Sequence, residues 1–364
     1  MSNVPLTGLI ITVILLISFN SFAEENKNLA PESTVEKIKR GYWDDPNMDY
    51  VSTALPIDDE DLVNIRVMPT LEKGVIVTAP LDRNDGLIVG ELGVNGGSKA
   101  IVLKLAQEMS EGQHGDFNSL LISHKGKLVF ESYYLYGRLN LAHPQASATK
   151  TYTGFALGRA IQLGYLTMAD LDKPLVSFLT ELDSSKFVDG TEKVTLHQAL
   201  TMHTGIRIIH EKGEEFKKYR DQLKGQKLVQ TIFEQSDPIT SESQRSFSYG
   251  NYSTPLVMQV IEAVVPGTAQ DFIKIELLGK MGIKTYEWRT GMGGLPTPGG
   301  KSSFSSRDMM KFGTLAMNKG IWNGAQLIPE AYISKATSRI VTTGEDIKVF
   351  GGGKNVSNQG YGYF

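Results

Sequence analysis

A serine and a lysine three residues apart form the pattern in this chain with the clearest chemical meaning. Ser147 and Lys150 make up its single Ser-x-x-Lys sequence, and apolar residues at helical spacing follow as far as Gly164. Residues three apart share a helix face, so we expect the lysine amine one turn from the serine hydroxyl. Unpaired N–H groups at a helix start stabilise negative charge. The spacing therefore predicts a serine nucleophile whose proton a neutral Lys150 amine accepts.

The single Tyr-x-Asn sequence supplies two further candidates, Tyr249 and Asn251. An ammonium group beside a phenol favours its anionic form, which suits Tyr249 to pass protons to a leaving group. The amide of Asn251 can orient Lys150 or a substrate carbonyl. Apolar residues at helical spacing follow the motif as far as Val264, so an exposed turn should lead into a helix.

Each motif alone also has a structural explanation. Ser-x-x-Lys describes an N-capping serine followed by a solvated lysine. Tyr-x-Asn describes a turn with a half-buried tyrosine. Both motifs occur once, in this order and each beside a predicted helix, so we favour the catalytic interpretation, in which the two converge in one cleft.

Four segments, taken together and in order, resemble the landmarks of one family. They are residues 147–154 (Ser-Ala-Thr-Lys-Thr-Tyr-Thr-Gly), 200–206, 247–253 and 305–313. Over about residues 98–364 the chain resembles the beta-lactamase-related serine hydrolases, which include class C beta-lactamases, DD-peptidases, family VIII esterases and 6-aminohexanoate-oligomer hydrolases. The resemblance implies an acyl-enzyme mechanism, with Ser147 as nucleophile, Lys150 as its activator and Tyr249 as proton shuttle.

One landmark of that family has no counterpart in the sequence. Its members carry a third motif, Lys-Thr-Gly or a His- or Gly-rich substitute, on a strand that by resemblance supplies one oxyanion N–H. Losing such a donor costs about 2.7–4 kcal/mol of transition-state stabilisation. Residues 360–364 look like the run just before this motif, so we expect the C-terminal strands to be missing. Residues 300–303, Gly-Lys-Ser-Ser, mimic the motif superficially but match the loop before a Ser-Arg-Asp helix start, and we expect them to be structural.

The remaining sequence indicates how these residues are positioned. Residues 101–109 suggest a helix, and apolar runs at 120–122 and 128–130 suggest a hairpin, after which the chain is mainly helical. We expect an α+β, beta-lactamase/transpeptidase-like fold, an antiparallel sheet flanked by helices with an inserted mainly helical lobe. The predicted domains are a signal peptide (1–23), an N-terminal extension (24–95) and the hydrolase domain (96–364), with the helical lobe at about 155–290.

The composition excludes several classes of function. The chain has no cysteine, so disulfides and thiol catalysis are excluded. Its six histidines form no His-Glu-x-x-His, and we expect neither a metal nor a cofactor. The net charge of −3 gives no sign of a nucleic-acid surface. The expected partner is a small-molecule or peptide substrate, and the oligomeric state stays open.

The N-terminus predicts export. Residues 6–19 are apolar and small residues stand at Ser21 and Ala23, which is typical of a signal peptide cleaved before Glu24. A periplasmic location and no stable membrane span after cleavage are expected. The alternative is a retained N-terminal anchor, for which the apolar run is short.

Two classes of function remain. The first is an exported serine hydrolase that forms an acyl-enzyme on Ser147 and cleaves an amide, ester or lactam. The alternative is a catalytically silent penicillin-binding-like protein that binds peptide or cell-wall ligands. Ser147, Lys150 and Tyr249 favour the hydrolase, because a binding protein has no need of a proton relay. The choice among peptide, ester, lactam and oligoamide depends on the shape of the pocket and stays open.

Overall fold

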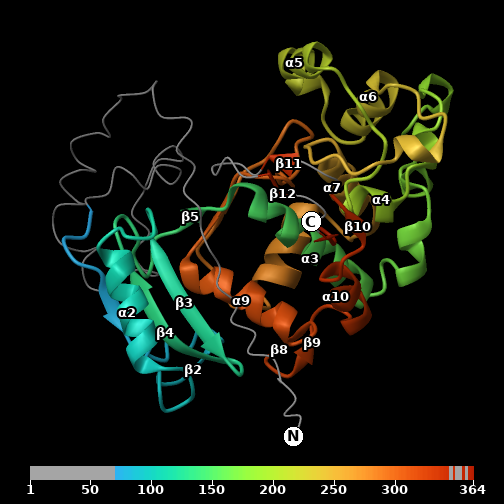
Figure 1. Cartoon of the computed structure of the whole chain (residues 1–364). Coiled ribbons are helices and arrows are strands. Elements are labelled where there is room, and N and C mark those ends of the chain that lie inside the picture. Colours follow the sequence, from blue (N-terminus) through green and yellow to red (C-terminus); the bar gives the residue numbers. More distant parts are fainter. Residues whose placement is uncertain (1–69, 344–346, 349–354, 357–359) are drawn as a thin grey trace, which may run out of the picture. The chain divides into compact units, whose positions relative to one another are not determined.

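The computed structural model describes residues 70–343, 347–348, 355–356 and 360–364. The predicted signal peptide and residues 24–69 of the predicted extension therefore lie outside the described residues. The chain divides into two compact units, coloured along the sequence in Figure 1. The first unit combines Met1–His143 with Phe304–Thr314, and the second combines Pro144–Ser303 with Leu315–Phe364.

The first unit is built on a four-stranded sheet centred on β4 (Lys127–Tyr133). β3 (Ser119–His124) pairs antiparallel with β4 along one edge, which confirms the predicted hairpin. β1 (Val75–Val77) runs antiparallel to one end of the opposite edge, and β2 (Ile88–Val89) runs parallel to the other end. The sheet is therefore mixed rather than wholly antiparallel.

The sheet includes residues of the predicted N-terminal extension. We placed residues 70–95 in an extension outside the hydrolase domain, but β1 and β2 lie within this range and pair with β4. Strands of two and three residues are too short to show the alternation that identifies a strand in a sequence. The described part of the predicted extension thus contributes two strands to the sheet of the first unit.

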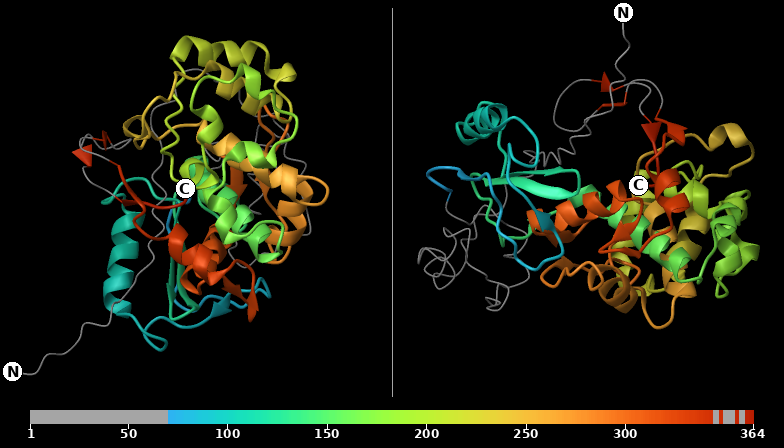
Figure 2. Two further views of the ribbon diagram at one scale, coloured as in Figure 1. Left: turned by 90° about the vertical axis from the view of Figure 1, so that its right-hand side faces the viewer. Right: turned by 90° about the horizontal axis from the view of Figure 1, so that it is seen from below.

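Helix α2 (Lys99–Ser110) packs on the sheet of the first unit. Ser98 caps the helix by accepting a hydrogen bond from the Ile101 amide, as a serine N-cap does. The helix predicted at residues 101–109 is confirmed, and Figure 2 shows it in cyan along one face of the sheet. The core that the helix shares with the sheet contains Leu92, Ala106, Met109, Leu120, Val129, Phe130 and Tyr134.

Helix α9 (Ser306–Met317) begins at the Ser-Arg-Asp sequence, as predicted. The buried Arg307 guanidinium donates to both carboxylate oxygens of Glu131, at 2.9 and 3.0 Å, and to Asp85 at 3.1 Å. Burial alone would lower the pKa of Arg307, but Glu131 and Asp85 raise it. This segment therefore ties α9 to the sheet of the first unit.

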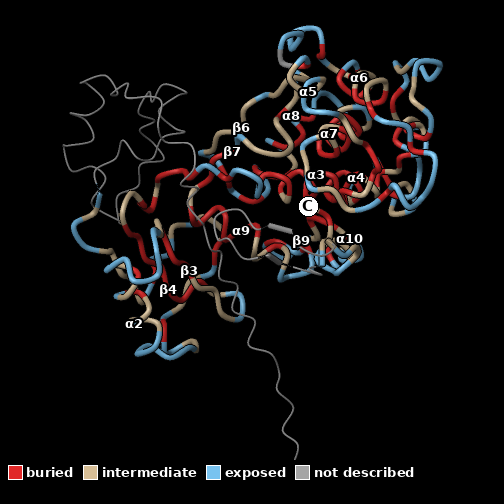
Figure 3. The backbone as a smooth tube through the Cα atoms, turned by 45° about the horizontal axis from the view of Figure 1, so that its top comes forward, coloured by how far each residue is buried: buried red, intermediate tan, exposed pale blue. Residues whose placement is uncertain are grey.

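The second unit is mainly helical, and α3 and α7 pack against each other at its centre. Buried backbone follows both helices in Figure 3. The helices predicted after the two motifs are thus confirmed. The helices of this unit are α3 (Thr149–Gln162), α4 (Leu196–Leu200), α5 (His210–Lys218), α6 (Lys227–Gln235), α7 (Ser253–Val264), α8 (Ala269–Phe272), the π-helix η11 (Ile273–Leu278) and α10 (Glu330–Ala336).

Short strands connect these helices. The two-residue β5 (His143–Pro144) precedes the Ser-x-x-Lys segment. Four antiparallel pairs follow: β6 (Glu287–Trp288) with β7 (Ser302–Phe304), β8 (Ile321–Trp322) with β9 (Ala325–Gln326), β10 (Val341–Thr342) with β13 (Gly360–Tyr361), and β11 (Ile347–Lys348) with β12 (Asn355–Val356). Across the described ranges, no helix has the length and apolar character needed to cross a membrane.

Close packing of α10 fixes the position of α3. A Cβ atom at Gly158 would lie 2.6 Å from the Ile328 side chain and 2.7 Å from Tyr332, so a side chain at this position has no room. The Tyr332 hydroxyl donates to the Gly154 carbonyl oxygen at 2.8 Å. The helix that carries Lys150 is therefore packed against Tyr332 of α10 and against Ile328, which precedes that helix.

Candidate active site

Ser147 lies in a sharp turn just before α3. The 3-10 turn η4 (Ala146–Ala148) runs directly into the helix, which confirms the predicted place of Ser147 at a helix N-terminus. Ala146 has a φ of 43°, a left-handed conformation that non-glycine residues rarely adopt. The turn is anchored on its N-terminal side, where the Gln145 amide donates to Ser302 at 2.7 Å and the Gln145 side chain accepts from Tyr152 at 2.7 Å. Ser147 itself is exposed, so a substrate can reach its hydroxyl.

Lys150 is buried, with 2% of its surface exposed. Its Nζ donates to Ser147 Oγ at 3.3 Å, to Asn251 Oδ1 at 3.4 Å and to the Gly299 carbonyl at 3.1 Å. A buried amine requires such partners. The alternative of a solvated lysine is wrong, and the expected contacts with Ser147 and Asn251 are present.

The Lys150 amine lies over the face of the Tyr249 ring. The Lys150 Nζ is 4.9 Å from the ring centroid, a cation–π distance, and the tyrosine is 46% exposed. No described residue hydrogen-bonds its hydroxyl, so this group is open to a substrate. The ring of Tyr361 meets that of Tyr249 edge to face, with centroids 6.4 Å apart. The structure thus brings the two motifs together, as predicted.

Gly299 is part of the site although no sequence motif pointed to it. A Cβ atom there would lie 3.1 Å from Thr254 Oγ1, 3.3 Å from Lys150 Nζ and 3.4 Å from Asn251 Oδ1. The loop before it is fixed to α3, because Thr153 donates to the Pro298 carbonyl at 3.0 Å. The lysine amine is therefore held from one side by a backbone at which a side chain would be tightly packed.

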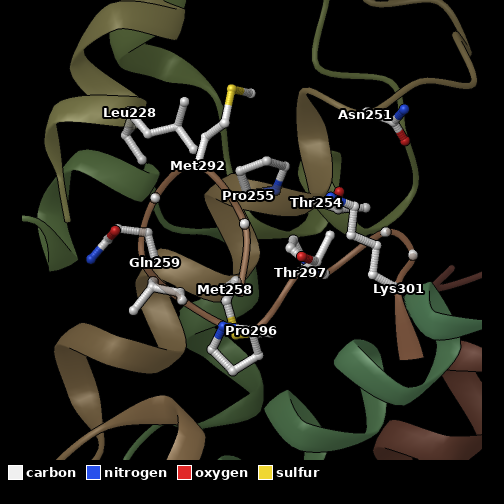
Figure 4. Close-up of a pocket in the computed structure, with 17 residues that line it drawn as sticks. Leu228, Asn251, Thr254, Pro255, Met258, Gln259, Met292, Pro296, Thr297 and Lys301 are labelled. Carbon is white, nitrogen blue, oxygen red and sulfur yellow. The ribbon is translucent and has the colours of Figure 1, made fainter. Parts of the chain in front are cut away.

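A cavity of about 430 Å³ adjoins this cluster in the second unit (Figure 4). Asn251 and Gly299 belong both to its wall and to the hydrogen-bond partners of Lys150. The described residues that line it are mostly apolar or glycine: Leu228, Val229, Asn251, Thr254, Pro255, Met258, Gln259, Gly291, Met292, Gly293, Leu295, Pro296, Thr297, Pro298, Gly299, Gly300 and Lys301. Sequence reasoning missed this cavity, because its lining comes from separate helices and one long loop.

Lys301 shows that the expectation for residues 300–303 was incomplete. We expected this stretch to be structural, yet Gly300 and Lys301 line the cavity. Ser302 does have a structural role, since its hydroxyl and that of Thr149 are 2.7 Å apart and join the loop to α3. Among the described residues, no group of three or more His, Asp or Glu side chains is placed to hold a metal ion.

The arrangement suits covalent chemistry at a carbonyl carbon. It combines an exposed hydroxyl at a helix start, an amine in hydrogen-bond contact with that hydroxyl and a phenol next to the amine.

Comparisons with known proteins agree with this architecture. The Beta-lactamase family model matches residues 105–364. Among solved structures, a putative 6-aminohexanoate-dimer hydrolase from Bacillus anthracis is similar, with 17% identity, coverage of 81% of this chain and 76% of that chain, and a TM-score of 0.52. A putative beta-lactamase from Bacteroides dorei is also similar, with 14% identity, coverage of 66% and 69%, and a TM-score of 0.53. The search of curated proteins found no match. Because the family model covers most of the chain, this protein belongs to the Beta-lactamase family and has the beta-lactamase/transpeptidase-like fold of its serine hydrolases.

Proposed function

We propose that this protein is an exported serine hydrolase that forms an acyl-enzyme on Ser147 and cleaves an amide, ester or lactam. The observation that carries the proposal is the buried Lys150 amine, 3.3 Å from the exposed Ser147 hydroxyl. A serine hydroxyl is a weak nucleophile until an adjacent base takes its proton. A lysine that served only to bind an anion would have no need of this contact.

The reaction has two halves. Ser147 Oγ attacks the carbonyl carbon while its proton passes to the neutral Lys150 amine. The carbon–nitrogen or carbon–oxygen bond then breaks, and the leaving group takes a proton from the Tyr249 hydroxyl, which Lys150 reprotonates. The backbone N–H of Ser147, at the start of α3, is a candidate donor to the oxyanion. In the second half a water molecule attacks the acyl carbon and loses its proton to the same relay. The bond between that carbon and Ser147 Oγ then breaks, Oγ takes a proton back from Lys150, and the acid leaves.

The proposal covers amide, ester and lactam bonds. One structural neighbour is named as a putative 6-aminohexanoate-dimer hydrolase and another as a putative beta-lactamase. Amides, esters and lactams all present a carbonyl carbon to a serine nucleophile. The alternative, a silent penicillin-binding-like protein, would be acylated or would bind without turnover.

Labelling and turnover together test the proposal. We expect a fluorophosphonate probe to add its mass to the peptide that contains Ser147. Ser147→Ala should abolish labelling, and Ser177→Ala, at another exposed serine, should not change it. Labelling of Ser147→Ala at the wild-type rate would refute the assignment. Turnover of p-nitrophenyl esters, nitrocefin or D-Ala-D-Ala peptides separates the hydrolase from the silent alternative.

Export is a separate part of the proposal. It is supported by the apolar residues 6–19 and the small residues before Glu24. Expression of the full chain in a Gram-negative host should yield periplasmic protein with an N-terminus at Glu24. An uncleaved, cytoplasmic product would contradict it.

A further inference from the structure

We propose that the cavity beside Lys150 binds an aliphatic chain of the substrate and that Lys301 pairs with a carboxylate near the scissile bond. The inference rests on the proposed function and names its substrate class. N-acyl amino acids combine both features, because an aliphatic acyl chain and a carboxylate lie on either side of one amide.

The cavity is continuous with the candidate catalytic residues. Asn251 and Gly299 form part of its wall, and both accept hydrogen bonds from Lys150. A Cβ atom placed on Gly300 would lie 3.8 Å from the Ala146 carbonyl, so the cavity loop also approaches the turn that carries Ser147. A chain attached to a carbonyl at Ser147 therefore has a direct route into the cavity.

The far end of the cavity is suited to a hydrocarbon chain. Figure 4 shows Leu228 and Met292 at the end opposite Asn251 and Lys301. The volume of about 430 Å³ falls within the range of about 300–1,000 Å³ typical of small-molecule sites. Burial of each methylene group should raise kcat/KM about fourfold until the space is filled.

The charge on the cavity wall favours an anion. Lys301 is the one charged residue among the described residues that line it, and no described carboxylate does so. Lys301 is exposed, and no ion pair joins it to any residue of the described part. An aliphatic chain extending to Leu228 leaves the carboxylate at the other end, where Lys301 and Asn251 lie.

The backbone at Lys301 provides a second observation. Its φ of 58° is left-handed, which is unfavourable for a residue with a long side chain. The conformation is held in place because the Arg289 amide donates to the Lys301 carbonyl at 3.0 Å. Such strain occurs preferentially at ligand sites, where the surrounding structure maintains it.

Two substrate series test the proposal on the full chain. The first consists of p-nitrophenyl esters with acyl chains of increasing length. We expect kcat/KM to rise with length to an optimum, and Met292→Trp, which fills the cavity from its loop, to move the optimum to shorter chains. An optimum at acetate, or one that Met292→Trp leaves unchanged, would overturn the assignment of the cavity.

The second series isolates the charge by comparing N-octanoylglycine with neutral N-octanoylglycinamide. We expect about tenfold higher kcat/KM for the acid, the size of a charge-assisted hydrogen bond. Lys301→Gln should reduce this preference to less than threefold and Lys301→Glu should reverse it. Lys224→Gln, a nearby exposed lysine outside the lining, should keep it.

The outcomes separate this inference from the proposed function. An absence of preference, or a preference retained in Lys301→Gln, would refute the role of Lys301 while fluorophosphonate labelling of Ser147 persists. Absence of that labelling would instead refute the proposed function.

Discussion

Lys150 receives its three hydrogen-bond partners from three separate parts of the chain. Ser147 lies on the preceding turn, Asn251 before α7, and the Gly299 carbonyl on the loop that leads to β7. Two of these partners, Ser147 and Asn251, are side chains whose type can be read from the sequence. The third is a backbone carbonyl, which every residue has. The position of the amine therefore depends on a loop as much as on the two motifs.

Gly299→Ala should lower kcat at least tenfold while leaving the fold intact. The added methyl group would come within 3.3 Å of Lys150 Nζ and 3.1 Å of Thr254 Oγ1, so the amine has to shift from its present position. A displacement of this kind is costly in catalysis because the reacting groups must be aligned. Steady-state rates and circular dichroism measure the two effects. Gly300→Ala is the matched control, since its methyl group meets one carbonyl at an ordinary 3.8 Å, and equal losses in both variants would contradict the argument.

Tyr249→Phe should retain the ring contacts with Lys150 and Tyr361 and remove only the hydroxyl. If this hydroxyl carries protons, kcat should fall about 10²–10⁴-fold with little change in the melting temperature. A loss smaller than tenfold would return Tyr249 to the role of a packing residue. Single-turnover rates of acylation show whether the first half of the reaction is the one affected.

The residue types at this site were predictable to different degrees. Ser147 and Lys150 carry functional groups at a spacing that one helical turn brings together, Asn251 belongs to the second motif, and the structure joins all three as predicted. Gly299 was not predictable, because it contributes a carbonyl that every residue has, in a chain with 37 glycines. The left-handed conformation of Ala146 was not predictable either, because alanine disfavours that conformation.

Among the elements, β13 has the most direct influence on the site. It pairs with β10 and brings Tyr361 beside the loop that carries Tyr249. The Tyr361 ring is 4.9 Å from that of Phe247, and its hydroxyl contacts the Met202 sulfur at 3.6 Å. Burial and the neighbouring Tyr249 raise the pKa of Tyr361, so its hydroxyl stays neutral. A two-residue strand thus supports the candidate proton shuttle from behind.

Tyr361→Leu should lower kcat more than it raises KM, because it removes the edge-to-face contact that positions the Tyr249 ring. Tyr361→Phe keeps the ring and should restore most of the rate. Tyr363→Phe serves as control, since Tyr363 contacts His197 and Tyr332. If Tyr361→Leu and Tyr361→Phe lose activity equally, the hydroxyl and not the ring is the important group.

Element length explains which parts of the fold could be predicted. The helices α2, α3, α7 and α9 and the hairpin of β3 and β4 are long enough for their periodicity to appear in the sequence. β1, β2 and β13 have two or three residues and are defined by their partners rather than by their own pattern. Tertiary pairing decides such strands, so no local signal could have shown them.

At the scale of the whole molecule, each unit has a core of its own. The sheet and α2 enclose one core in the first unit, and α3 and α7 lie at the centre of the second. The candidate active site and the cavity both belong to the second unit. Conditions that destabilise this unit should therefore abolish activity directly.

Acid should destabilise the second unit through His197. Burial, the positive charge of Lys335 and the nearby His203 lower the pKa of His197 to about 4. In the unfolded chain the pKa of histidine is about 6.5, so between pH 6.5 and 4 the unfolded state binds a proton that His197 in the folded state does not. The free energy of unfolding is therefore highest above pH 6.5 and decreases as the pH falls toward 4. One such proton changes stability by at most about 1.4 kcal/mol per pH unit, and by less here because the ring is partly exposed.

Urea unfolding between pH 4 and pH 8 measures this effect. The free energy of unfolding should fall below pH 6.5 in the wild type and fall less steeply in His197→Gln. His210→Gln, at an exposed histidine of the same unit, should retain the wild-type slope. Identical slopes in all three proteins would show that His197 does not titrate on unfolding.

The left-handed Ala146 has a consequence for how the protein responds to selection for heat resistance. Glycine would relieve the conformational cost, about 1–2 kcal/mol for a residue with a Cβ, but it would also increase the entropy of the unfolded chain by an amount worth about 0.4–1 kcal/mol. The two effects largely cancel, so thermal selection has little to gain at this position. Glycine would also allow the turn more conformations, and Ser147 would spend less time in the one that faces Lys150. Ala146→Gly should therefore be tolerated without enrichment in a screen for stability alone and disappear from one that also demands turnover.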